Sequence, residues 1–262
     1  MIGFQEEKFD VYNLHPPVII LGVPVTPVTV EALHRYIYRC IRGGQRALIL
    51  NANVHALNLA YSYPRFRAVF QRADLVFCDG AGVLLAARML NSNLPERITY
   101  ADWMWQLADL SSTCSFSLFF LGSRPGIAEK AAMRLKEKFP NFNIVGVHHG
   151  FFDKARGSLE NEKVIQLINQ VSPDILIVGF GMPLQELWLN ENWEHLQVRV
   201  ALTGGAVFDY ISGELKRAPR WMNDHGLEWL GRLLIEPKRL WKRYLIGNPL
   251  FIWRILKQKI GF

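Results

Sequence analysis

The chain has 262 residues, of which 50% are apolar and 20% are charged. This length and balance fit one large α/β domain, or a domain of about 200 residues with an appendage, and they exclude a disordered chain and a disulfide-stapled miniprotein. The three cysteines, Cys40, Cys78 and Cys114, are odd in number and far apart. They predict neither a disulfide framework nor a zinc site, and they fit a reducing, cytoplasmic setting.

The positive charge of the chain is concentrated at its C-terminal end. Residues 216–262 hold 11 of the 30 Lys and Arg residues but only 3 of the 23 acidic residues, so this tail carries +8 and the rest of the chain −1. Such a patch attracts phosphate-rich partners, which include nucleic acid, an anionic membrane surface and a substrate that contains a diphosphate.

The sequence has no apolar run of the roughly 20 residues that a spanning helix needs. Its first residues, MIGFQEEKFD, carry acids where a signal peptide would carry bases. We therefore expect a protein that neither spans a membrane nor follows an obvious export route.

Short β-branched or aromatic runs alternate with helical patterns along the chain. Seven runs are strand candidates: 18–21, 47–50, 75–78, 116–121, 144–147, 175–178 and 198–202. Three of the intervening helices are predicted over 29–42 with Thr29 as N-cap, over 127–139 and over 159–171. The alternation predicts a doubly wound, largely parallel sheet flanked by helices.

The composition changes near Gly213, and the sequence after it has helical patterns, is basic and is rich in tryptophan. We expect a catalytic domain over 1–215 and a basic helical appendage over 216–262. Two apolar stripes are predicted in this tail, Leu227, Leu230, Leu233 and Leu234 in one, and Trp241, Tyr244 and Leu245 in the other. Basic residues between aromatic ones favour a helix that lies at a membrane surface, although packing on the sheet with a solvated basic face is the alternative.

Ligands of a doubly wound sheet bind at the carboxyl ends of the strands, so the loops that follow the predicted strands are candidate sites. Asn51 and Asn53 follow the second run, where amides can hold sugar hydroxyls or cap the next helix. Asp79 follows the third run and is placed to act as a general base, with a helix N-cap as the alternative.

Glycine-rich loops follow three further runs. The segment Gly122-Ser123-Arg124-Pro125-Gly126 predicts an anion site at a helix start, or a simple turn. Gly179-Phe-Gly181 begins like a dinucleotide fingerprint without its third glycine, and Gln185 and Glu186 follow it. Gly204-Gly205 with Asp209 allows close approach of a ligand and an acceptor for a ribose or base.

Several motifs are missing from the sequence. It has no Asp-x-Asp pair for a divalent cation on a nucleotide diphosphate, no phosphate-loop motif and no nucleophile elbow. The adjacent His148 and His149 are poor metal partners, so we expect no metal. An NAD-linked oxidoreductase and a basic nucleic-acid-binding protein remain as alternatives, which NADH titration and salt-sensitive DNA binding would test.

Taken together and in order, these segments resemble the WecG/TagA/CpsF family of bacterial glycosyltransferases. The resemblance covers roughly residues 18–245. It is carried by Leu21-Gly22-Val23-Pro24, Asn51-Ala-Asn53, Asp79-Gly80-Ala-Gly82, Glu96-Arg97-Ile-Thr-Tyr-Ala-Asp102, Gly122 to Gly126, Gly179 to Glu186, Gly204 to Asp209, Arg217-Ala-Pro219 and Gly226-Leu-Glu228-Trp229-Leu-Gly-Arg232-Leu233.

The resemblance implies transfer of a sugar, an N-acetylhexosamine or a related hexose, from a UDP-sugar to a polyprenyl-diphosphate-linked acceptor, with inversion and without a metal. It implies that Asp79 is the general base and that the site also contains Asn51, Asn53, Arg97 and Gln185. It further implies that the nucleotide is surrounded by Gly122, Ser123, Gly181, Gly204, Gly205 and Asp209.

For the tail, the resemblance implies contact with the lipid diphosphate and with an anionic inner-membrane surface through Arg217, Arg232, Lys238, Arg239 and Arg243. We accordingly expect a peripheral protein on the inner face of the plasma membrane in cell-surface polysaccharide synthesis. We expect no nucleic-acid partner, and the partly apolar tail makes a homo-oligomer plausible. Relatives often have threonine at the position of Asn51, which implies a different donor or acceptor preference here.

Overall fold

A computed structural model describes residues 16–219, 221–222 and 225–261. The acidic N-terminal segment that argued against a signal peptide lies outside the described residues. These described residues contain eight strands: β1 (Val18–Ile20), β2 (Val23–Val25), β3 (Ala47–Ala52), β4 (Leu75–Cys78), β5 (Ser117–Gly122), β6 (Asn143–His148), β7 (Ile175–Gly179) and β8 (Val200–Thr203). All seven predicted runs are strands, within a few residues at their ends.

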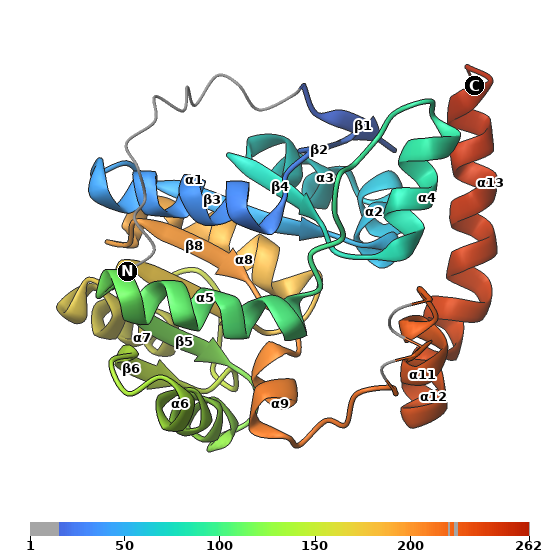
Figure 1. Ribbon diagram of the computed structural model, residues 1–262. Helices are drawn as coiled ribbons and strands as arrows, with labels where there is room; N and C mark the ends of the chain where they lie inside the picture. Colours follow the sequence, from blue (N-terminus) through green and yellow to red (C-terminus); the bar gives the residue numbers. More distant parts are fainter. Residues whose placement is uncertain (1–15, 220, 223–224, 262) are drawn as a thin grey trace.

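Helices lead into the large sheet, fill the connections between its strands and follow its last strand (Figure 1). They are α1 (Val30–Arg42), α2 (Val54–Ser62), α3 (Pro64–Arg72), α4 (Ala81–Met89), α5 (Tyr100–Cys114), α6 (Ile127–Lys138), α7 (Leu159–Val171), α8 (Leu184–Asn192), the short 3-10 turn Trp193–His195 and α9 (Val207–Ser212). The predicted cap is confirmed, since the side chain of Thr29 accepts from the amide of Ala32 at the start of α1.

Six strands form one parallel sheet in the order β4-β3-β8-β7-β5-β6. Its strands alternate their side chains between two apolar layers. In β3, Leu48 and Leu50 point to one layer, where α2, α3, α4, α7 and α8 pack. Ala47 and Ile49 point to the other layer, where α1, α5, α6 and α9 pack. The predicted doubly wound α/β fold is confirmed.

The first predicted strand does not join this sheet. β1 pairs with β2 in a separate antiparallel hairpin, with Val18 opposite Val25 and Ile20 opposite Val23. Its two turn residues, Leu21 and Gly22, both have positive φ, at 50° and 81°. Two such residues make the tight turn whose twist matches a hairpin, so strand 23–25 follows directly.

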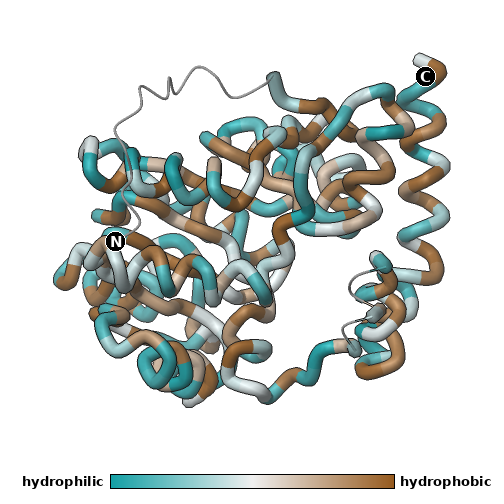
Figure 2. Tube along the Cα trace, in the orientation of Figure 1, coloured by the Kyte–Doolittle hydropathy of each residue, from teal (hydrophilic) through white to brown (hydrophobic). Residues whose placement is uncertain are grey.

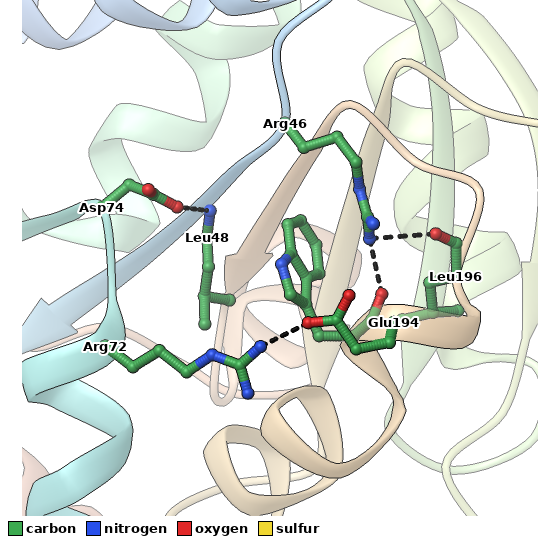
Figure 3. Close-up of polar contacts among 7 residues, drawn as sticks. Arg46, Leu48, Arg72, Asp74, Glu194 and Leu196 are labelled. Atoms are coloured by element: carbon green, nitrogen blue, oxygen red, sulfur yellow. Dashed lines mark hydrogen bonds and ion pairs between the residues drawn. The ribbon is translucent and has the colours of Figure 1, made fainter.

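Polar contacts join loops at the amino-terminal edge of the sheet, which is the edge opposite the candidate site (Figure 3). The guanidinium of Arg46, just before β3, donates to the carbonyls of Trp193 and Leu196. Asp74 accepts from the amide of Leu48 at 2.7 Å, and Arg72 forms an ion pair with Glu194. These contacts join elements that are far apart in sequence, and none of them lies at the carboxyl edge, where the candidate loops are.

The tail forms α11 (Glu228–Ile235), α12 (Pro237–Trp241), a π-helical turn (Lys242–Ile246) and the long α13 (Gly247–Lys259). In Figure 1, α13 stands along one side of the molecule, beside α2 and α4. Phe251 and Ile255 of α13 are buried in the same apolar layer as α2 and α4. Arg254 donates to Asn58 and Ser62 of α2, and Gln258 bonds to the β1–β2 hairpin.

The predicted stripes of the tail are only partly correct. Leu233 is buried with Leu240 and Tyr244 in a small cluster of its own, but Leu234 is 70% exposed and Leu245 is 56% exposed. The short helices turn between the two segments, so a single helical register does not extend through them. Figure 2 shows hydrophobic and hydrophilic residues alternating along α13. Within the described ranges, no helix combines the length and the apolar character that crossing a bilayer requires.

Candidate active site

A cleft of about 1100 Å³ lies at the carboxyl edge of the parallel sheet. Its floor follows the sheet order, with Asp79 after β4, Asn51 at the end of β3, the loop after β8 and Gly179 at the end of β7. The opposite wall comes from the tail, from α11 through the start of α13. Parallel strands bring their carboxyl ends together, which explains why residues so far apart in sequence share one cavity.

Asp79, Asn51 and Thr203 form a chain of hydrogen bonds across three neighbouring strands. The hydroxyl of Thr203 donates to Oδ1 of Asn51 at 3.0 Å, and Nδ2 of Asn51 donates to Oδ2 of Asp79 at 2.7 Å. Thr203 and Asn51 are both buried. Because an ionised carboxylate only accepts hydrogen bonds, the amide nitrogen of Asn51 faces Asp79, and its oxygen is left to accept from the Thr203 hydroxyl. The chain holds Asp79 in one orientation.

The surroundings of Asp79 suit a general base that works near neutral pH. Burial raises the pKa of Asp79 to about 7, and the negative charge of Glu228 acts in the same direction. The hydrogen bond from Asn51 and the positive charge of Arg232 lower this pKa in part. Asp79 does not cap α4, whose N-cap is Gly80 without a side-chain bond. Its carboxylate instead has a backbone hydrogen bond at Tyr100, the first residue of α5.

Asn53 and Arg97 also line the cleft. The side-chain oxygen of Asn53 accepts from the amide of Ala56 at 3.1 Å and caps α2. The cap takes the oxygen and leaves the Nδ2 side of the amide on the cleft wall. Arg97 is half-buried between β4 and α5, close enough to Cys78 for its charge to act on that thiol.

Gln185 is fully buried, and its side chain joins two glycine loops. Its Oε1 accepts from the amides of Gly181 at 3.1 Å and Gly205 at 3.0 Å, and its Nε2 donates to Glu186 at 2.8 Å. Burial raises the pKa of Glu186 to about 7. The Gln185 side chain therefore fixes the shape of the floor between β7 and β8, and the cleft reaches it at the edge.

The loops after β5, β7 and β8 pack backbone against backbone. A Cβ added to Gly122 would lie 2.4 Å from the carbonyl oxygen of Gly179, and one added to Gly179 would lie 2.8 Å from that of Gly205. Gly122 stands behind the cleft wall, whereas Gly181, Gly204 and Gly205 line it. Gly122 and Gly179 have no room for a side chain, whereas Gly181 and Gly205 leave open space above their Cα atoms.

Ser123 and Asp209 meet at the wall of the cleft nearest β5. The Ser123 hydroxyl donates to Oδ2 of Asp209 at 3.0 Å, and the Ser123 amide donates to the carbonyl of Gly179 at 3.0 Å. The loop that the sequence predicted as an anion site thus has one of its amides bonded internally. Arg124, next in the chain, also lines the cleft.

Of the five tail cations singled out in the sequence, three line the cleft: Arg232, Arg239 and Arg243. Burial lowers the pKa of the Arg243 guanidinium, and Arg239 is paired with Glu236. The other two lie elsewhere. Arg217 is paired with Asp102 of α5, and Lys238 is exposed, and neither of them is among the residues that line the cleft.

Sequence reasoning missed His55 and Glu228, both of which line the cleft. Burial lowers the pKa of His55 to about 4, and the charge of Arg243 adds to the effect, so this imidazole is neutral at pH 7. The sequence offers one clue to His55, which lies two residues after Asn53, the N-cap of α2. Glu228 lies one helical turn before Arg232 on α11, a spacing that puts both on one face. Among the described residues, no three His, Cys, Asp or Glu side chains gather as a metal site.

Comparison with known proteins agrees with this architecture. Residues 18–262 match the model of the Glycosyl transferase WecG/TagA/CpsF family. The chain is also similar to N-acetylglucosaminyldiphosphoundecaprenol N-acetyl-beta-D-mannosaminyltransferase of Staphylococcus aureus strain MRSA252, at 29% identity over 211 residues, which is 80% of each chain. The protein of the same name from strain NCTC 8325 / PS 47 matches at the same identity and coverage.

The family match extends over most of the chain, including the tail that walls the cleft. The chain therefore belongs to the WecG/TagA/CpsF family of glycosyltransferases and is an enzyme of that class.

Proposed function

We propose that this enzyme transfers an N-acetylmannosamine-type sugar from a UDP-linked donor to an N-acetylglucosamine carried on a polyprenyl diphosphate. The name of the Staphylococcus aureus relatives supports this acceptor and this sugar. The observation that carries the proposal is the Thr203–Asn51–Asp79 chain at the floor of a cleft with arginines on the facing wall.

In the proposed reaction, a hydroxyl of the acceptor sugar attacks the anomeric carbon of the donor. The Asp79 carboxylate takes the hydroxyl proton, the new C–O bond forms, and the bond to the UDP oxygen breaks with its electron pair on the diphosphate. Attack from the face opposite to UDP inverts the anomeric centre. A strand-end carboxylate with a pKa of about 7 is half ionised at neutral pH, which suits a general base.

The donor is proposed to lie over the loops after β5, β7 and β8. Gly181 and Gly205 leave open space above their Cα atoms, which admits a nucleotide close to the backbone. Asp209 and Ser123 lie at the wall of the cleft nearest β5, where a carboxylate can accept from ribose or base. Arg97 is proposed to face the departing diphosphate.

The acceptor diphosphate is proposed to lie against the tail. Arg232 and Arg243 both line the cleft and are close enough to Asp79 for their charges to act on it or to be affected by it. In the described part of the chain, the Nε atoms of both arginines are buried without a hydrogen-bond partner. A diphosphate in the cleft would give these guanidinium groups a charged acceptor. Arg232, Arg243 and Arg97 are proposed to neutralise the charge of the diphosphate groups without a divalent ion.

The outer face of the tail is proposed to contact an anionic membrane surface from the cytoplasmic side. Trp253 and Leu256 on α13 and Ile260 just after it are 53%, 48% and 68% exposed and recur at helical spacing. Lys257 lies over the Trp253 ring at 5.1 Å. Aromatic and basic residues on one face are typical of a helix in the headgroup region.

Removing the whole tail would also remove Phe251 and Ile255 from the core, so point substitutions test the membrane proposal better. Trp253→Ser with Leu256→Ser should weaken binding to vesicles that contain phosphatidylglycerol and leave the melting temperature near that of the wild type. Leu167→Ser, on the exposed face of α7, is the matched control. Equal vesicle binding by the wild type, the Trp253→Ser/Leu256→Ser variant and the control would contradict a membrane face on α13.

The proposed reaction is tested by incubating the full-length protein with a short-chain polyprenyl-diphosphate N-acetylglucosamine and one donor at a time. UDP-N-acetylmannosamine, UDP-N-acetylglucosamine and UDP-glucose are compared, each with EDTA and with magnesium. We expect transfer from the first donor, in EDTA as well as in magnesium. Transfer from another UDP-sugar alone would correct the donor, and transfer that needs magnesium would overturn the metal-free step.

A further inference from the structure

The chain passes from α9 toward the tail through residues 213–219, which cross in Figure 1 from α9 to the side of the molecule where α11 and α12 lie. Arg217 leaves this connection and forms a two-pronged ion pair with Asp102 in the first turn of α5. Nη1 contacts Oδ1, and Nη2 donates to Oδ2 at 3.0 Å. A bidentate pair fixes direction as well as distance.

The same guanidinium faces a second carboxylate. Nη2 of Arg217 lies 4.0 Å from Oε1 of Glu228, the first residue of α11. The exposed fraction of the three side chains falls from 59% at Asp102 to 27% at Arg217 and 22% at Glu228. The bridge thus runs from the surface of α5 to the wall of the cleft, where Glu228 is a lining residue.

Apolar packing attaches the α11 segment to the sheet only weakly. Leu233, Leu240 and Tyr244 form a cluster separate from both main cores. Gly231 lies so close to the connection that an added Cβ would be 2.2 Å from Cβ of Ala218. The segment packs on itself, on Ala218 and Met222, and through Arg232 on the Tyr210 ring of α9. None of these contacts reaches α5, so the ion pair of Arg217 with Asp102 ties the segment to a further element.

We infer that Asp102 is a positioning residue for sugar transfer, which through Arg217 holds Glu228 and the cleft-facing side of α11 over the active site. The part of this inference that concerns transfer rests on the proposed function. Arg217 is then an anchor and does not contact the lipid diphosphate, in contrast to its sequence-based assignment. Both of its Nη groups face carboxylates, and it is not a lining residue of the cleft.

The test compares Asp102→Asn, Asp102→Glu and a control, Glu194→Gln, in the full-length protein. Glu194 pairs with Arg72 at the opposite edge of the sheet (Figure 3), so its loss removes an exposed ion pair without touching the tail. Hydrogen exchange of the amides of residues 228–236 reports how firmly α11 is held, and it needs no substrate. Transfer kinetics report the KM of the donor and of the lipid acceptor separately.

We expect Asp102→Asn to lower the exchange protection of α11 by about tenfold, since it removes a bidentate, charge-assisted contact. It should raise the acceptor KM and leave the donor KM near its wild-type value. Asp102→Glu should restore both in large part, and Glu194→Gln should change neither.

Unchanged α11 protection in Asp102→Asn would overturn the inference. So would an equal loss in Glu194→Gln, or an acceptor KM that stays constant while α11 loosens. If the wild type transfers no sugar, the proposed function fails, while the exchange data still decide whether the bridge holds α11.

Discussion

Removing the amide of Asn51 should shift the pH dependence of the enzyme toward higher pH. In the wild type, Nδ2 of Asn51 donates to Asp79 at 2.7 Å and thereby lowers a pKa that burial has raised to about 7. The ionised carboxylate loses this donor in Asn51→Ala, so the pKa of Asp79 must rise. A base of higher pKa needs a higher pH to be ionised.

The size of the shift follows from the hydrogen bond. A bond to a charged group contributes about 1.5–3 kcal/mol, and one pH unit corresponds to about 1.4 kcal/mol. Because Asp79 keeps the charge of Arg232 and the backbone contact at Tyr100, we take the lower end, about one pH unit. The ionised fraction of Asp79 at pH 7 then falls from about one half to about one tenth, which lowers kcat/KM about fivefold.

The assay follows UDP release at limiting acceptor from about pH 5 to about pH 9, where kcat/KM for the acceptor reports groups of the enzyme form that binds it. The loss in Asn51→Ala should be recovered at the alkaline end. Thr203→Val is the graded control, because it removes the 3.0 Å bond that orients Asn51 and keeps the amide beside Asp79. It should shift the midpoint in the same direction by less. A uniform loss at every pH, or a midpoint that moves downward, would refute the reasoning.

Three further outcomes follow from the site. Because the folded pKa of Asp79 is about 7 against 3.8 for the unfolded chain, ionising it destabilises the fold, so Asp79→Asn should raise the melting temperature at pH 8, with a gain that shrinks as the pH falls below 7. Gly122→Ala would place a Cβ 2.4 Å from the Gly179 oxygen and should cost about 2–4 kcal/mol in urea unfolding; a smaller cost would mean that the loops can separate. Arg243→Gln should raise the acceptor KM at least several-fold with the donor KM unchanged, and the opposite pattern would move the acceptor diphosphate elsewhere.

The strands, three helices and the gathering of Asn51 and Asp79 at one edge could be predicted because they depend on local signals. Apolar runs of four to six residues, a capping Thr29 and the rule for parallel sheets are sufficient for them. The separate hairpin β1–β2 was missed because its turn depends on positive φ at Leu21, a conformation that leucine rarely signals.

Side-chain partnerships in the site could not be predicted from spacing. Gln185 follows a glycine motif in sequence, but it is buried and bonds the amides of Gly181 and Gly205. The sequence does not distinguish the basic residues of the tail from one another, yet Arg243 lines the cleft and Arg217 is paired with Asp102. These differences depend on which elements meet in three dimensions, and that information is not local.

The role of Asp79 is tested most directly by measuring transfer to the lipid-linked acceptor with Asp79→Asn at saturating donor, pH 8. The amide keeps the size of the side chain but cannot accept the proton, so kcat should fall by about 10²–10⁴-fold while binding of the UDP-sugar, followed by calorimetry, stays near the wild-type value. Transfer close to the wild-type rate with normal donor binding would contradict the assignment of Asp79 as the base.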